Sequence, residues 1–159
     1  MRRKDREITD VARIQSIIGD CTDVRLAMLD NGAPYIVALN FGYELTDGTL
    51  TLYFHGALEG KKIDALKRDP AVYFQMHCGG APIVGSVDNP CAFGWKYKSV
   101  AGSGIARFID APQAKAHALD RIIAHTFKSD RTYDFPQNAL SKTCVFAVDC
   151  TDFTAKQRD

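Results

Sequence analysis

The stretch Thr49-Leu-Thr-Leu-Tyr-Phe-His-Gly-Ala-Leu-Glu-Gly-Lys-Lys62 contains a strand followed by the first turn of a helix. Apolar side chains recur at every second position from Leu50 to Phe54, which is the pattern of a β-strand with one buried face. After Gly60 the apolar spacing becomes helical, and we expect a helix from Lys61 to Asp69 that Pro70 ends. The rest of the chain is interpreted outward from this strand and helix.

Two further strands precede this one, and tight turns connect all three. Val24–Leu29 and Pro34–Tyr43 flank Asp30-Asn31-Gly32, a strong hairpin signal. Thr46-Asp47-Gly48 then turns the second strand into the strand that begins at Thr49. Three consecutive strands joined in this way predict an antiparallel meander rather than βαβ units.

The remaining segments extend this sheet and surround it with helices. The segment His77–Pro90 is rich in Gly and Pro, and we expect a long loop of the kind that often borders a binding site. The whole chain, residues 1–159, is expected to form a single domain that is mainly β with flanking helices, an antiparallel closed or split β-barrel. The other expected elements are a helix that Thr9 and Asp10 can cap and that ends near Ile18, a helix capped by Asp110 and ending near Lys128, strands at 72–76 and 143–153, and one or two strands within 95–108.

The composition excludes several classes of protein. Hydrophobic residues make up 46% and charged residues 25%, and the net charge of +1 is too small to attract nucleic acid or anionic lipid. The sequence contains neither a membrane-spanning apolar run nor the apolar part of a signal peptide, which predicts a cytoplasmic protein. The five cysteines contain no CxxC pair, which argues against a zinc site or a disulfide framework, and Cys78 falls in the expected loop.

The order of charges in the helix after strand 49–54 is unusual. Lys61 and Lys62 lie in its first turn, at the positive end of the helix dipole, where each cation costs roughly 0.3–1 kcal/mol. An anion would reverse this cost, because free backbone N–H groups, two ammonium groups and the flexible Gly60 together form a phosphate-binding arrangement. The alternative is that both lysines are simply solvated, and the charge order alone leaves both interpretations open.

Other residues near this helix are suited to a planar ligand. Asn40 offers a donor and an acceptor at the end of one strand, and His55 ends the next strand beside Gly56, which allows close backbone approach. His55 alone is equally an ordinary strand-end histidine, and no second ligand at suitable spacing indicates a metal. The aromatic cluster Trp95–Ser99 would either stack on a ring, seal a subunit interface or simply pack in the sheet.

The ordered motifs of the chain resemble the nitroimidazole-resistance branch of the pyridoxamine-phosphate-oxidase-like flavoproteins. The resemblance covers nearly the whole sequence, and it implies a split β-barrel that forms a homodimer with two FMN clefts at the interface. The motifs are Met1-Arg-Arg-Lys-Asp-Arg-Glu-Ile8, Pro34-Tyr-Ile-Val-Ala-Leu-Asn-Phe-Gly-Tyr-Glu44, Tyr53-Phe-His-Gly-Ala57, Glu59-Gly-Lys-Lys62 and Lys96-Tyr-Lys-Ser-Val-Ala-Gly102.

The resemblance also implies a role for each matching residue. Lys61 and Lys62 match the basic pair that holds the FMN phosphate, although the oxidase branch has Arg-Lys there and so gains a bidentate contact. The flavin ring is expected along Val37, Ala38, Leu39 and Asn40, next to Phe54, His55 and Gly56, with Tyr97, Ser99 and Val100 supplied by the partner subunit.

The function implied is that of an FMN-dependent oxidoreductase acting on small nitro-aromatic compounds or related acceptors, with His55 as the catalytic residue facing substrate. The alternative is a dimer that binds flavin or haem without turnover. The oxidase branch ends in an Arg-x-His pair that grips the substrate phosphate, whereas this chain ends Ala155-Lys-Gln-Arg-Asp159. Vitamin-B6 oxidation is therefore not expected.

Overall fold

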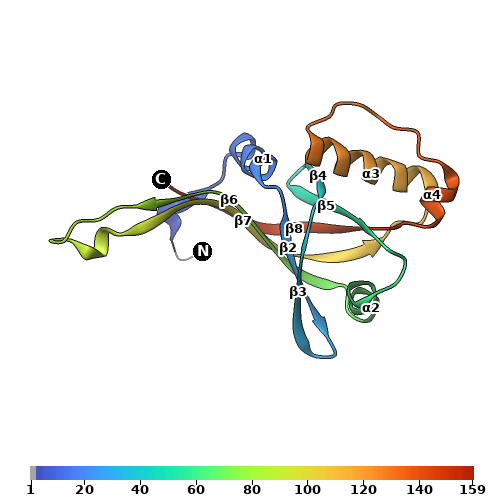
Figure 1. Ribbon diagram of the computed structural model, residues 1–159, viewed down its shortest axis with the longest axis horizontal. Helices are drawn as coiled ribbons and strands as arrows, with labels where there is room; N and C mark the ends of the chain where they lie inside the picture. Colours follow the sequence, from blue (N-terminus) through green and yellow to red (C-terminus); the bar gives the residue numbers. More distant parts are fainter. Residues whose placement is uncertain (1–2) are drawn as a thin grey trace.

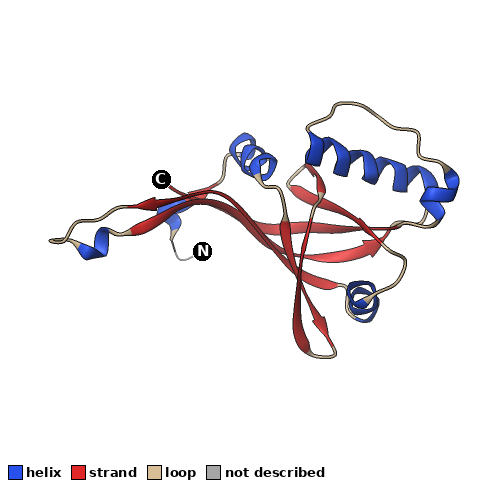
Figure 2. Ribbon diagram, viewed as in Figure 1, coloured by secondary structure: helices blue, strands red, loops and turns tan. Residues whose placement is uncertain are grey.

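A computed structural model describes residues 3–159, so Met1 and Arg2 of the N-terminal motif lie outside it. Its centre is an antiparallel sheet of eight strands in the order β3-β2-β6-β7-β8-β5-β4, with β1 paired to β8 (Figures 1 and 2). The two end strands, β3 and β4, do not pair with each other within residues 3–159, which leaves the barrel split on that side. The strands are β1 Glu7–Ile8, β2 Val24–Asp30, β3 Ala33–Leu39, β4 Gly42–Thr46, β5 Thr49–Gly56, β6 Ala71–Ile83, β7 Gly94–Phe108 and β8 Cys144–Arg158.

The two predicted tight turns are confirmed. Asn31 and Gly32 have φ values of 51° and 81°, and Asp47 and Gly48 have φ values of 50° and 79°, the left-handed conformations that a two-residue hairpin turn requires. The predicted meander is wrong, because the expected strand 34–43 divides into β3 and β4 at opposite ends of the sheet order. The division places Phe41 in the core, where it is fully buried.

The prediction of a loop for the whole segment 77–90 is wrong, because its first half, 77–83, is strand. β6 continues to Ile83 and pairs with β7, and together they form a long hairpin arm that projects from the body of the molecule (Figure 1). The glycines are accommodated by a shift in register between Cys78 and Ala81, where Gly79 has a φ of 69°. A strand that bulges in this way tolerates glycine without ending.

Within residues 3–159, four α-helices surround the sheet: α1 Val11–Asp20, α2 Lys61–Arg68, α3 Pro112–Phe127 and α4 Gln137–Ser141. Asp10 caps α1 as predicted, accepting a hydrogen bond from the backbone N–H of Arg13 at 2.8 Å. The predicted cap at Asp110 is wrong, since the N-cap of α3 is Ala111 and no side chain bonds there. Short 3₁₀ turns occupy Lys4–Arg6 and Pro90–Ala92.

Two apolar clusters hold the layers together. The larger lies between the sheet and helices α1 and α2, and it includes the fully buried Phe54, Phe74 and Phe146. The smaller joins α3 to the opposite face of β5 and β8 through Tyr53, Ile122 and Ala147, among others (Figure 2). Among the described residues no helix has the length and apolarity needed to cross a membrane.

Candidate functional site

The N-terminus of α2 is open to solvent and positively charged. Gly60 precedes the helix with φ 128° and ψ 166°, a conformation that side-chain-bearing residues rarely adopt, and it provides no side-chain cap. Its carbonyl accepts from the N–H groups of Ile63 and Asp64, so the N–H groups of Lys61 and Lys62 have no acceptor within the helix. Ile63 is buried and anchors this turn against the sheet.

Lys61 is directed toward the β2–β3 hairpin. Its ammonium lies 3.1 Å from the Oδ2 of Asp30 and 4.7 Å from the centre of the Tyr35 ring. Asp30 also pairs with Arg68, at the other end of α2, so one carboxylate serves two cations. Part of the charge of Lys61 is thus already neutralised by the protein itself.

Lys62 has no such partner. No carboxylate within residues 3–159 lies within 4 Å of its ammonium, and its side chain lies against Gly56 at the end of β5. A Cβ atom at Gly56 would come within 2.9 Å of the Nζ of Lys62, so a larger residue there would shift the end of the lysine side chain. The neighbouring His55 is exposed, yet nearby protein atoms and the charge of Lys62 lower the pKa of its imidazole. Its neutral form therefore predominates at neutral pH.

The predicted flavin-binding residues Val37–Asn40 form the end of β3 and the residue after it, and their side chains alternate between the two faces of the strand. Val37 and Leu39 pack toward the main core, on the face of β3 that also carries Tyr35 and thereby meets Lys61. Ala38 and Asn40 are exposed on the opposite face. A ligand lying along the exposed face of β3 would therefore contact the side chains of Ala38 and Asn40. It would contact Val37 and Leu39 only through their backbone atoms.

Phe54 lies beneath the site rather than in it. Its ring is fully buried and stacks on Phe146 with 5.0 Å between ring centres. The strand β5 therefore offers His55 and the backbone around Gly56 to a ligand, while Phe54 fixes the strand against β8.

Tyr97, Ser99 and Val100 do not join this site within one chain. Phe146 pairs with Phe54, next to His55, and with Phe108 of β7, and Tyr97 lies eleven residues from Phe108 in β7, or roughly 36 Å in an extended strand. Val100 is fully buried, whereas Tyr97 and Ser99 line an open hollow of about 400 Å³.

That hollow lies on a sheet face that none of the described helices covers. It is lined by Tyr97 and Ser99 together with Gln75, His77 and Trp95. The face also exposes large apolar side chains, with Ile36 at 62%, Tyr73 at 53% and Trp95 at 54%. Sequence reasoning missed Gln75 and His77, because they fall at the boundary of the segment interpreted as a loop. It also missed Asp30 and Tyr35, which look like ordinary hairpin residues until α2 is placed beside them.

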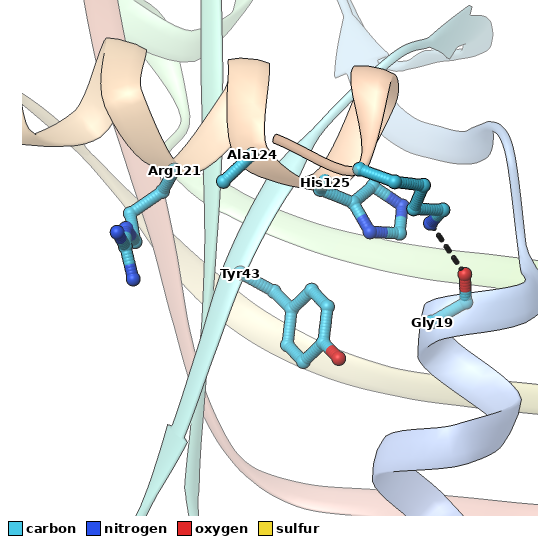
Figure 3. Close-up of a pocket in the computed structure, with 6 residues that line it drawn as sticks. Gly19, Tyr43, Arg121, Ala124 and His125 are labelled. Atoms are coloured by element: carbon cyan, nitrogen blue, oxygen red, sulfur yellow. Dashed lines mark hydrogen bonds between the residues drawn. The ribbon is translucent and has the colours of Figure 1, made fainter. Parts of the chain in front are cut away.

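A separate hollow of about 390 Å³ lies between α1, β4 and α3 (Figure 3). Lys128 donates to the carbonyl of Gly19 at 2.7 Å, and His125 bonds the carbonyl of Cys21 at 2.9 Å. The side chain of His125 is buried and packs against Phe41, with ring centres 4.3 Å apart. These contacts join α3 to the end of α1 and have a structural role.

The fold and the basic helix start define a class: split β-barrel proteins with a cationic helix N-terminus at the end of the sheet. The sequence profile of the pyridoxamine 5'-phosphate oxidase family matches residues 10–157, and the chain belongs to this family. No curated protein sequence matches the chain significantly. The recognised resemblance is thus confirmed at the level of the family and the fold.

Solved structures agree with this assignment. A protein from Bacteroides thetaiotaomicron, proposed to confer 5-nitroimidazole antibiotic resistance, is 32% identical, with a TM-score of 0.79 over 95% of this chain and 86% of that one. The flavocytochrome Anf3 from Azotobacter vinelandii is 20% identical, with a TM-score of 0.78 over 100% and 72% of the two chains. An FAD- and haem-binding protein from Mycobacterium smegmatis is 16% identical, with a TM-score of 0.76 over 97% and 74%. The last two share the fold.

Proposed function

We propose that this protein binds FMN, with the phosphate at the N-terminus of α2. The observation that carries the proposal is Lys62, an ammonium without a carboxylate partner among residues 3–159, held over Gly56 beside unbonded helix N–H groups. A phosphate at this place would accept from those N–H groups and neutralise Lys62, the combination that stabilises anions at helix N-termini. The residues present therefore fit a phosphate-bearing flavin.

We also propose that the working form is a homodimer. The uncovered face that exposes Ile36, Tyr73 and Trp95 has the apolar and aromatic composition of a subunit interface. Because Tyr97 and Ser99 lie too far from Lys62 in their own chain, a second copy is the source from which they would reach a flavin. An isologous dimer would form two equivalent sites. Light scattering should give a dimer mass, and Ile36→Asp should lower it to that of a monomer.

The activity we propose is reduction of small nitro-aromatic compounds. Bound flavin would carry the electrons, while the protein orients the substrate and excludes water. His55 is placed to hydrogen-bond a substrate group, and its lowered pKa leaves one ring nitrogen free to accept and the other able to donate. The similarity to the Bacteroides protein supports nitroimidazoles as the first compounds to test.

The test is a rapid-mixing experiment on FMN-loaded protein reduced with dithionite under argon. Addition of a 5-nitroimidazole should reoxidise the flavin at a rate that rises with its concentration, and His55→Ala should slow this step at unchanged FMN affinity. Protein that retains FMN but is reoxidised by oxygen alone would instead be a flavin carrier without this activity. The five unbridged thiols fit a reducing compartment, and we propose a cytoplasmic location.

A further inference from the structure

A cavity of about 310 Å³ lies between α2, α3, the end of β7 and the start of β8. Most of its wall is apolar, with Leu58, Phe108 and Val145 among the lining side chains. Three charged residues complete it: Lys67 from α2, Asp110 before α3 and Lys115 from the first turn of α3. Its volume is at the lower end of the range for small-molecule sites.

Lys115 is the unusual feature of this cavity. Its side chain is only 9% exposed, and its ammonium donates to the carbonyls of Leu140 at 3.1 Å and Thr143 at 2.8 Å. These two bonds use two of its three hydrogens. No carboxylate within residues 3–159 lies within 4 Å of it, so a buried positive charge is hydrogen-bonded but not neutralised. Buried charges in proteins are normally paired, because an unpaired one is costly.

The carbonyls of Leu140 and Thr143 lie at the C-terminal end of α4, which favours a cation, but no carboxylate completes the neutralisation of Lys115 among residues 3–159. Lys115 lies at the positive end of the α3 dipole, where the N-cap Ala111 contributes no side-chain bond. Lys67 adds a second positive charge from the opposite wall, and Asp110 is the single negative charge in the lining. Burial raises the pKa of the Cys144 thiol in the same wall, while the charges of Lys115, Lys67 and Lys62 act against this rise. The cavity is therefore apolar with a net positive charge.

We propose that this cavity binds a small organic monocarboxylate with an aromatic or branched body. The carboxylate would accept the third hydrogen of Lys115 and neutralise it, with Lys67 closing the opposite side. The body would lie on Leu58, Phe108 and Val145. Asp110 disfavours ligands with two negative charges, so a phosphate monoester fits less well than a carboxylate. The cavity adjoins the Lys62 position, because its lining residues Cys144 and Val145 pair with Gly56 and His55, but neither Lys62 nor His55 lines it.

The first test is calorimetric titration of the full chain with benzoate, and then with benzyl alcohol, its neutral analogue. Benzoate should bind at least tenfold more tightly, because a hydrogen bond to a charged group contributes about 1.5–3 kcal/mol. Repeating the titration with saturating FMN should leave the benzoate affinity unchanged. Equal binding of the two compounds, or displacement of benzoate by FMN, would overturn the proposal.

Two variants locate the site. Lys115→Met keeps the length of the side chain and should reduce benzoate affinity at least tenfold, whereas the control Lys96→Met, on the exposed arm, should not change it. Leu58 is 49% exposed at the rim, so Leu58→Trp should fill the cavity and abolish binding without disturbing the core, even if the Lys115 variant folds poorly. Unchanged affinity in Leu58→Trp would contradict the assignment.

Discussion

Replacing each lysine of the basic pair by methionine should have unequal effects on FMN binding. Lys61 is 59% exposed and already bound to Asp30, which also pairs with Arg68, so its loss should cost about 0.5–1 kcal/mol. Lys62 has no carboxylate partner among residues 3–159 and lies over Gly56. Its loss should cost about 1.5–3 kcal/mol, the value for a hydrogen bond to a charged group.

These energies correspond to a rise in Kd of about two- to fivefold for Lys61→Met and about 10- to 150-fold for Lys62→Met. Quenching of flavin fluorescence on titration with protein measures both values. Riboflavin is the matched control ligand, because it has the ring but lacks the phosphate, and both variants should bind it as the unmodified protein does. A larger loss for Lys61→Met than for Lys62→Met, or the same losses with riboflavin, would refute the phosphate assignment.

Three further predictions follow from single contacts. Gly56→Ala should weaken FMN binding about tenfold at unchanged thermal stability, because the new Cβ would lie 2.9 Å from the Nζ of Lys62 and displace it; unchanged affinity would show that Lys62 need not occupy this position. Burial lowers the folded-state pKa of His125, so below about pH 6.5 the unfolded chain binds more protons, and the free energy of unfolding decreases as the pH is lowered. His125→Gln should flatten this pH dependence in urea titrations, and an unaltered slope would assign the dependence to another group. Tyr53 donates to Glu44 at 2.6 Å, and Tyr53→Phe should lower the free energy of unfolding by about 1–2 kcal/mol, whereas no loss would mean that water replaces the bond.

Sequence patterns correctly predicted the turns and the helix cap, which depend on residues close together in the chain. The hairpin at Asn31-Gly32 and the cap at Asp10 depend on a few neighbouring residues, and both are confirmed. The segment 77–90 was misread because glycines that usually indicate a loop are accommodated by a bulge in a long hairpin. The chain leaves β3 and enters β4 around Phe41, which is fully buried, and this burial becomes visible only in the three-dimensional packing.

In the candidate site, too, sequence predicted what neighbouring residues determine and missed what long-range packing determines. Charge order singled out Lys61 and Lys62, and the structure places Lys62 beside His55 and Gly56 but directs Lys61 toward the β2–β3 hairpin. Sequence could not show that the two lysines differ, since the partner of Lys61 is Asp30, which lies far away in the chain. It also could not show that a single chain keeps Tyr97 away from the basic pair, because that distance depends on the register of β6 and β7.

The central claim is that the chain holds a flavin by its phosphate at the start of α2. The most direct measurement compares the affinities of the unmodified protein for FMN and riboflavin, together with the visible spectrum of the protein after desalting. The account predicts a retained flavin band with one FMN per chain, and riboflavin bound at least tenfold more weakly. A colourless protein that takes up no added FMN, or equal affinity for the two flavins, would contradict it.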